Sequence, residues 1–154
     1  MATYEPLVYI VEDEPLYRLL IEHALEKHSF NNYKCFSSGE KCLEEIGNNP
    51  DVIFLDYYLD NRDGLDILKE IKKIRRKTKV IFLSSQKNIR VAVEAMKSGA
   101  SDYIVKDSFA FKKMIKALKK IKDTRVLKGV TLVKSVLIAW VIIALIYAIL
   151  SYSF

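Results

Sequence analysis

Five short apolar runs alternate with longer stretches of helical periodicity, and this alternation constrains the fold more than any other feature. Four of the five runs contain no charged residue, as is typical of strands that are buried on both faces of a sheet. The runs are Leu7–Val11, Tyr33–Phe36, Val52–Leu55, Val80–Leu83 and Tyr103–Val105. Because each run is followed by a helical pattern, the chain predicts an α/β domain with a parallel sheet, right-handed crossovers and helices on both faces.

Five helices are expected after these strands. Pro15 suits the first turn of the first helix. Apolar residues continue that helix at helical spacing, namely Leu16, Leu19, Leu20 and Ala24. The helices are predicted at about 15–30, 38–46, 64–77, 88–98 and 109–126. The connections left between strands and helices are short, as in a compact domain.

Charge is distributed unevenly along the chain. Residues 1–111 hold 16 basic and 18 acidic residues, residues 112–134 hold 9 and 1, and residues 135–154 hold none. The net charge of +6 therefore describes a near-neutral domain, a basic segment and an apolar end. A basic chain invites a nucleic-acid hypothesis, but the apolar end that follows the basic segment argues against it. No nucleic-acid partner is expected.

The uncharged end is long enough for a membrane span. Its 20 residues would reach about 30 Å as a helix, the thickness of the hydrocarbon core of a bilayer. The alternative is a hydrophobic helix that packs on the domain or forms an oligomer. Such a helix would have to bury apolar side chains all the way round, which a domain of this size can hardly cover.

These features divide the chain into a domain at 1–125, a basic juxtamembrane segment at 126–134 and a transmembrane helix at 135–154. Basic residues flank only the N-terminal side of the span, which predicts a cytoplasmic domain on the cytoplasmic membrane. The beginning of the chain lacks a signal-peptide pattern, which agrees with a domain on the cytoplasmic side of the membrane. The lysines of the fifth helix form either its solvated face or a surface that binds anionic lipid headgroups.

Polar residues follow four of the five predicted strands, at the sheet edge that holds the binding crevice of such folds. They are Glu12 and Asp13 after the first strand, Asp56 after the third, Ser84 after the fourth and Lys106 after the fifth. Singly, each has an ordinary interpretation as a helix cap, a turn residue or a surface charge. Together, three carboxylates require a cation, and an oxygen-only site with room for waters suits Mg²⁺.

Lys106 and Ser84 add chemistry of a different kind to this edge. An ammonium and a hydroxyl are both good partners for phosphate oxygens. An acidic crevice with a metal and phosphate-binding groups indicates a carboxylate nucleophile that accepts a phosphoryl group, for which Asp56 is the candidate.

The ordered set of residues resembles the receiver domain of two-component response regulators over about residues 5–125. Glu12 and Asp13 match the acidic pair of the family and Asp56 matches its phosphoacceptor. The remaining matches are Asp63-Gly64 beyond the acceptor, Ser84 for the family's Ser/Thr, Tyr103 for its switch aromatic, and residues 99–106 for its last strand. The resemblance implies a flavodoxin-like fold with five parallel strands in the order 2-1-3-4-5.

The resemblance also implies roles for these residues. Mg²⁺ would be bound by Asp13, Asp56 and the backbone carbonyl of Tyr58, with Glu12 acting through water. Lys106 and Ser84 would contact the phosphoryl oxygens, and the donor would be a phosphohistidine on a histidine kinase or phosphotransfer protein. After phosphorylation Ser84 would move towards the phosphate and Tyr103 would turn inward, as a shift between two packings.

Asp107 departs from the family, which usually has proline after the lysine in a cis peptide. A cis bond before a non-proline residue costs about 3–4 kcal/mol, so the Lys106–Asp107 bond is expected to be trans.

The sequence therefore predicts a membrane-anchored receiver that is phosphorylated on Asp56 and signals through protein contacts, with an unidentified downstream protein. It would catalyse its own phosphotransfer and dephosphorylation and would not be a turnover enzyme. The alternative is a receiver-like scaffold that is never phosphorylated and docks a membrane partner. A hydrolase with Asp56 as nucleophile is a third class, which no substrate-pocket motif supports.

Overall fold

The computed structural model describes residues 4–60, 62–85 and 88–152, with side chains for all of these except residues 128 and 147–152. The chain divides into two compact units. One runs from Glu5 to Lys119, and the other begins at Lys120 and includes the N-terminal residues up to Tyr4. The first unit contains every described strand and is the part of the chain in which the predicted site lies.

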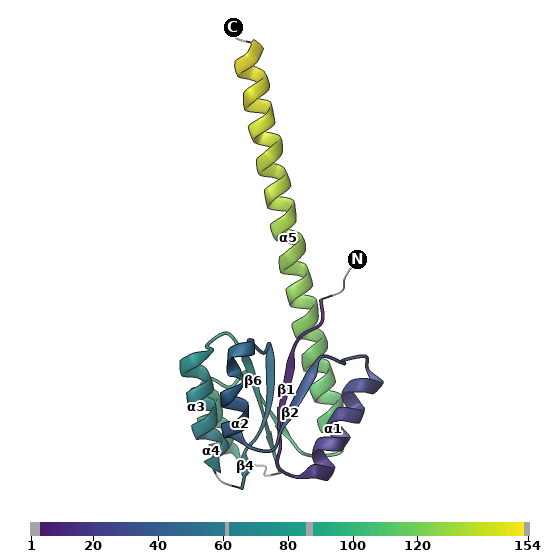
Figure 1. Ribbon diagram of the computed structural model, residues 1–154, viewed down its shortest axis with the longest axis vertical. Coiled ribbons are helices and arrows are strands. Elements are labelled where there is room, and N and C mark those ends of the chain that lie inside the picture. The colour runs from purple at the N-terminus through teal and green to yellow at the C-terminus, as the bar shows by residue number, and fades with distance from the viewer. Residues whose placement is uncertain (1–3, 61, 86–87, 153–154) are drawn as a thin grey trace. The chain divides into compact units, whose positions relative to one another are not determined.

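Five parallel strands form the main sheet in the order β2-β1-β3-β6-β7 (Figure 1). Their bounds are Val8–Val11 for β1, Tyr33–Phe36 for β2, Val52–Asp56 for β3, Lys79–Ser84 for β6 and Asp102–Val105 for β7. All five coincide with the predicted apolar runs to within a residue or two. In order of appearance in the main sheet the strands follow 2-1-3-4-5, so the flavodoxin-like doubly wound prediction is confirmed.

Helices cover both faces of this sheet. α1 and the first turns of α5 lie on one face, and α2, α3 and α4 lie on the other (Figure 1). The helices are α1 at Pro15–Lys27, α2 at Gly39–Glu44, the 3-10 helix η1 at Ile46–Asn48, α3 at Gly64–Ile74, α4 at Ile89–Lys97 and α5 at Ala110–Tyr152. Side-chain caps explain where three of them begin: Ser38, Asp63 and Asn88 each accept a hydrogen bond from a backbone amide in the first turn.

The central strands are the most buried part of the unit. All side chains of Val8–Val11 and Val52–Leu55 are fully shielded from solvent. Even Tyr9 is buried, because its hydroxyl donates to the backbone oxygen of Glu45 at 3.0 Å and accepts from Asn48 at 3.1 Å. Two-sided burial of β1 and β3 fixes the position of whatever follows each strand.

α1 buries a different stripe from the one that its leucines suggest. Ile21 and Leu25 are fully buried, whereas Leu16, Leu19 and Leu20 are 63%, 59% and 44% exposed. The apolar spacing thus identified the helix correctly, but it did not show which of two neighbouring apolar stripes faces the sheet. That choice depends on how the helix is rotated when it packs.

A small hairpin follows β3, in the connection expected between the third predicted strand and the helix at 64–77. β4 at Tyr58–Leu59 pairs antiparallel with β5 at Arg62–Asp63. The chain then returns to the end of β3, where the amide of Gly64 donates to the backbone oxygen of Tyr57 at 3.0 Å. A Cβ at Gly64 would overlap the backbone oxygen of Asp56, so this close approach requires glycine.

α5 differs most from expectation. The sequence predicts a fifth helix that ends at about Val126, but a single helix runs from Ala110 to Tyr152, so the predicted end is wrong. The division into a basic segment at 126–134 and a membrane span at 135–154 stays a prediction. The described side chains between Val130 and Ile146 are all exposed. Among the described residues α5 is the one helix that is long and apolar enough to cross a membrane. The last two residues of the predicted span, Ser153 and Phe154, lie outside the described residues.

Candidate functional site

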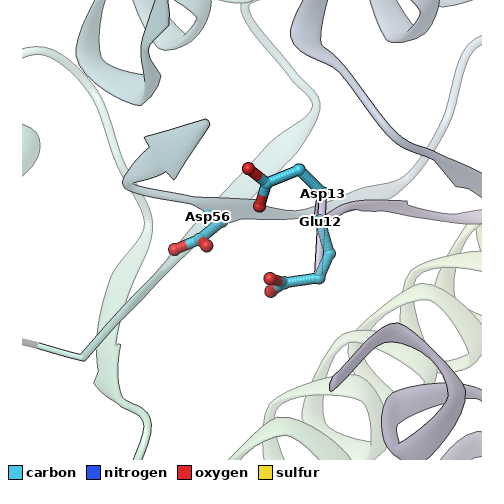
Figure 2. Close-up of side chains that lie close together, drawn as sticks. All are labelled: Glu12, Asp13 and Asp56. Carbon is cyan, nitrogen blue, oxygen red and sulfur yellow. The ribbon is translucent and has the colours of Figure 1, made fainter. Parts of the chain in front are cut away.

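The ends of β1 and β3 bring three carboxylates together. Val11 pairs with Leu55 in the parallel ladder, so the residues that follow, Glu12 and Asp56, are neighbours at the carboxyl edge of the sheet. Asp13 is the next residue after Glu12. One carboxylate oxygen from each of the three acids lies within 4.8 Å of the others. Figure 2 shows the three side chains close together at the ends of their strands.

These carboxylates differ in exposure. Glu12 is fully buried and Asp56 is 5% exposed, whereas Asp13 is partly open to solvent. Asp13 also accepts a hydrogen bond from the backbone amide of Asp60 at 3.1 Å, which ties it to the loop of the β4–β5 hairpin. The site therefore has two buried acids and one acid at its rim.

Lys106 lies directly after β7 and joins the two buried acids. Its ammonium nitrogen is 2.7 Å from an oxygen of Asp56 and 2.8 and 3.0 Å from the two oxygens of Glu12. The buried Oε2 atom of Glu12 is ion-paired with this ammonium at 2.8 Å and has no hydrogen-bond donor among the described residues.

Burial controls the protonation of Glu12. Desolvation is the largest influence and raises the pKa of Glu12 to about 7, the hydrogen bond from Lys106 lowers it, and the charge of Asp56 raises it. Burial also acts to lower the pKa of Lys106, but its hydrogen bonds to Asp56 and Glu12 outweigh burial and the net shift is upward. One ammonium among three carboxylates leaves excess negative charge, so these residues fit a divalent cation with oxygen ligands.

The loop after Lys106 shows what Asp107 does in place of proline. No described peptide bond is cis, so the expected trans bond before Asp107 is confirmed. Asp107 accepts the backbone amide of Phe109 at 2.9 Å and pairs with Lys113 at 3.0 Å. Both contacts favour the start of α5, and the amide of Lys106 is held by the backbone oxygen of Ser84 at 2.7 Å.

Ser84, Tyr103 and Tyr58, the other predicted site residues, lie on β6, β7 and β4. Ser84 is fully buried at the end of β6, in register with Val105, the residue before Lys106. Tyr103 is partly buried on β7 and packs against the core. Tyr58 is 49% exposed in β4. The roles of these residues in metal binding or switching stay predictions.

Two residues of α1 contact the site without having been predicted. Arg18 donates to the backbone oxygen of Glu12 at 2.7 Å, and the ring of Tyr17 lies 4.5 Å from the ammonium of Lys106. The sequence gives only a weak indication of these two contacts. Both residues follow the acidic pair within one or two helical turns, but so do many other side chains that lie near such a site.

A doubly wound parallel sheet with acidic, hydroxyl and ammonium groups at its carboxyl edge defines the class of phosphoryl-accepting signalling modules. The family model for the response regulator receiver domain matches residues 8–119, and the chain belongs to this family. It is thus a receiver domain of two-component signalling, a class that binds Mg²⁺ in an acidic pocket and exchanges phosphoryl groups with histidine kinases or phosphotransfer proteins.

Individual relatives agree with this assignment. The chain is 30% identical over 115 residues to the chemotaxis protein CheY of Thermotoga maritima. The aligned region covers 74% of this chain and 95% of that CheY. It is 31% identical over 100 residues to the regulatory protein AtoC of Escherichia coli, covering 64% of this chain but only 22% of AtoC. Among solved structures, the receiver domain of the Francisella response regulator 1452 superposes with a TM-score of 0.71 at 27% identity, covering 79% of this chain and 99% of that one.

Proposed function

We propose that this protein accepts a phosphoryl group on Asp56 in a Mg²⁺-dependent reaction, is anchored in the membrane by α5, and signals through protein contacts. The observation that carries the proposal is the position of Asp56. It ends a fully buried strand, lies within reach of Glu12 and Asp13, and is paired with Lys106 at 2.7 Å. A carboxylate in that setting is positioned and is electrostatically matched to an incoming phosphoryl group.

The transfer uses Asp56 as the nucleophile. An oxygen of Asp56 forms a bond to phosphorus while the bond from phosphorus to the donor breaks, and the donor leaves with that electron pair. Asp13, Asp56, the backbone carbonyl of Tyr58 and, through water, Glu12 would hold Mg²⁺, which when bound would supply positive charge for the phosphoryl oxygens.

Lys106 and Ser84 complete the site. Lys106 stays protonated and exchanges part of its contact with Asp56 for a phosphoryl oxygen, and the Ser84 hydroxyl donates to another. Both groups come from strand ends that adjoin β3 or β6, so a small movement brings them to the phosphate.

The reaction ends with hydrolysis of the acyl phosphate by water, so the protein acts once per phosphoryl group received and has no turnover substrate. The donor is a phosphohistidine on a histidine kinase or phosphotransfer protein, which supplies the specificity that a small donor lacks.

Membrane anchoring rests on the C-terminal part of the chain. Residues 135–154 carry no charge, and the described side chains from Val136 to Ile146 are exposed and almost all large and apolar. The 9 basic residues at 112–134 lie on one side of that span, which favours a cytoplasmic receiver by the positive-inside rule.

Labelling by a small phosphodonor tests the phosphoacceptor proposal. Full-length protein incubated with acetyl phosphate and Mg²⁺ should take up a phosphoryl group, and uptake should be lost with EDTA or in Asp56→Asn. The matched control is Asp51→Asn, at the residue directly before the same strand, which should label normally. If the folded wild-type protein binds Mg²⁺ but takes up no phosphate, the scaffold function replaces this proposal.

A further inference from the structure

The ammonium of Lys106 has a third neighbour besides its two carboxylates. It lies over the ring of Tyr17, 4.5 Å from the ring centroid. Tyr17 belongs to α1, whereas Lys106 comes from the end of β7, so the contact joins two elements far apart in the chain. An ammonium within about 6 Å of an aromatic face is attracted by the ring quadrupole, and the attraction grows as water is excluded. The Lys106 side chain is only 11% exposed.

Tyr17 is itself held in place from the other side. Its ring packs on that of Phe111, in the first turn of α5, with centroids 5.5 Å apart and planes inclined by 30°. This separation lies within the range of 4.5–7 Å over which aromatic pairs attract each other. Phe111 is in turn placed by the start of α5, where Asp107 accepts the amide of Phe109. The ring of Tyr17 therefore has little freedom to move away from Lys106.

The hydroxyl of Tyr17 does not explain this placement. Its oxygen is buried, and within the described structure it has no hydrogen-bond partner. Burying a hydroxyl without a hydrogen bond is unfavourable. What the site gains from Tyr17 is consequently the aromatic face that meets the ammonium.

We propose that Tyr17, backed by Phe111, is a positioning residue for phosphoryl transfer: its ring holds the Lys106 ammonium against Asp56 and Glu12. The inference rests on the proposed function at Asp56 and adds a determinant of its rate. Tyr17 touches no reacting atom. It acts by restricting Lys106, so that the lysine meets the phosphoryl oxygens without first being ordered.

A variant series in the full-length protein tests this role. With acetyl phosphate and Mg²⁺, Tyr17→Leu should slow labelling about three- to tenfold, the range expected for a partly desolvated cation–π contact. Tyr17→Phe keeps the ring and should label within about twofold of wild type. Phe111→Leu should slow labelling in the same direction as Tyr17→Leu. The matched control is Tyr33→Leu, which removes another half-buried tyrosine that bonds Glu26 instead of Lys106.

A double-mutant cycle separates positioning from general support of the fold. In a Lys106→Met background the ammonium is absent, so Tyr17→Leu should produce no further slowing. Equal loss in both backgrounds would show that Tyr17 acts on the fold and not on Lys106. Loss in Tyr17→Phe as large as in Tyr17→Leu would assign the role to the hydroxyl. Either result, or wild-type rates in Tyr17→Leu, overturns the proposal.

A spectroscopic readout keeps this test independent of phosphorylation. Ring currents from Tyr17 should shift the NMR signals of the terminal methylene of Lys106 upfield in wild type and Tyr17→Phe, and the shift should vanish in Tyr17→Leu. If wild type shows the shift but takes up no phosphate, the proposed function fails while the contact stands. If wild type is labelled but shows no shift, the positioning role fails alone.

Discussion

Lys106 is the residue on which the electrostatics of the site depend. It is almost buried and pairs with two buried carboxylates, Glu12 and Asp56. Removing one partner of a buried ion pair leaves an uncompensated charge, which typically costs about 3–5 kcal/mol. The cost falls to about 2–4 kcal/mol where an acid with a raised pKa takes up a proton. We therefore expect Lys106→Met to lower the free energy of unfolding of the metal-free protein by about 2–4 kcal/mol at neutral pH, as measured by urea denaturation.

The control for this prediction is another lysine ion pair. Lys113 pairs with Asp107 at 3.0 Å, but its side chain is 47% exposed. Lys113→Met should therefore change the unfolding free energy by less than about 1 kcal/mol. Equal effects of the two substitutions would contradict the assignment of Lys106 as the counter-ion of the buried acids.

Glu12 gives the metal-free protein a specific dependence on pH. Burial raises the pKa of Glu12 from 4.5 to about 7, so the folded state holds a proton that the unfolded chain has already released across that interval. Stability from this group is therefore full below pH 4.5 and is lost as the pH rises through about 7. Thermal unfolding in EDTA should show this decline, and Glu12→Gln, which cannot ionise, should lack it. An identical slope in both proteins would exclude Glu12 as its source.

At the scale of elements, the turn from β3 into α3 links the fold to the site. Gly64 begins α3 against the end of β3, and an added Cβ would overlap the backbone oxygen of Asp56 and lie 3.1 Å from the Cα of Tyr57. These are backbone atoms of the acceptor residue and of the residue that follows it. We expect Gly64→Ala to destabilise the protein by about 1–3 kcal/mol and to slow labelling of Asp56.

Gly47 is the matched control for that substitution. It lies in η1, and a Cβ there would meet nothing within 4 Å. Gly47→Ala should leave stability within about 1 kcal/mol of wild type, with any change towards greater stability. Urea denaturation and acetyl phosphate labelling of both variants provide the comparison. A tolerated Gly64→Ala would mean that α3 can shift without displacing Asp56.

The strand ends could be predicted from the sequence because each depends on one local pattern. An apolar run fixes a buried strand, and the topology of a parallel sheet then places Asp56 and Lys106 on the same edge. The contact between Tyr17 and Lys106 could not be predicted in this way. It depends on how α1 is rotated, and the exposed leucines of α1 suggested a different buried stripe.

The end of the fifth helix could not be predicted for a related reason. The helix was expected to end near Val126, close to the start of the basic segment at 126–134, but a change in composition is not a stop signal for a helix. Neither proline nor a capping motif interrupts the chain there, and Gly129 alone does not end α5. The hairpin of β4 and β5 was missed because two-residue strands leave no periodicity to detect.

At the scale of the whole molecule, the proposed membrane anchor gives a prediction about where the protein is found. Full-length protein should remain with the membrane pellet through high-salt and alkaline washes and be released by detergent. Replacing both Val141 and Leu145 by lysine should weaken insertion by about 2.5–3.5 kcal/mol per residue at the centre of a span and shift protein to the soluble fraction. The conservative pair Val141→Ile and Leu145→Ile is the control. Recovery of the wild-type chain in the soluble fraction without detergent would contradict the anchoring proposal.

The central claim is that the phosphoryl group resides on Asp56, and mass spectrometry can locate it directly. Protein labelled with acetyl phosphate and Mg²⁺ would be reduced with borohydride, which converts an aspartyl phosphate to a stable alcohol, and then digested. We predict one modified residue, Asp56, and no modification in Glu12 or Asp13, although all three carboxylates share the site. Modification of either member of the acidic pair, or of none of the three in protein that has taken up phosphate, would contradict the account.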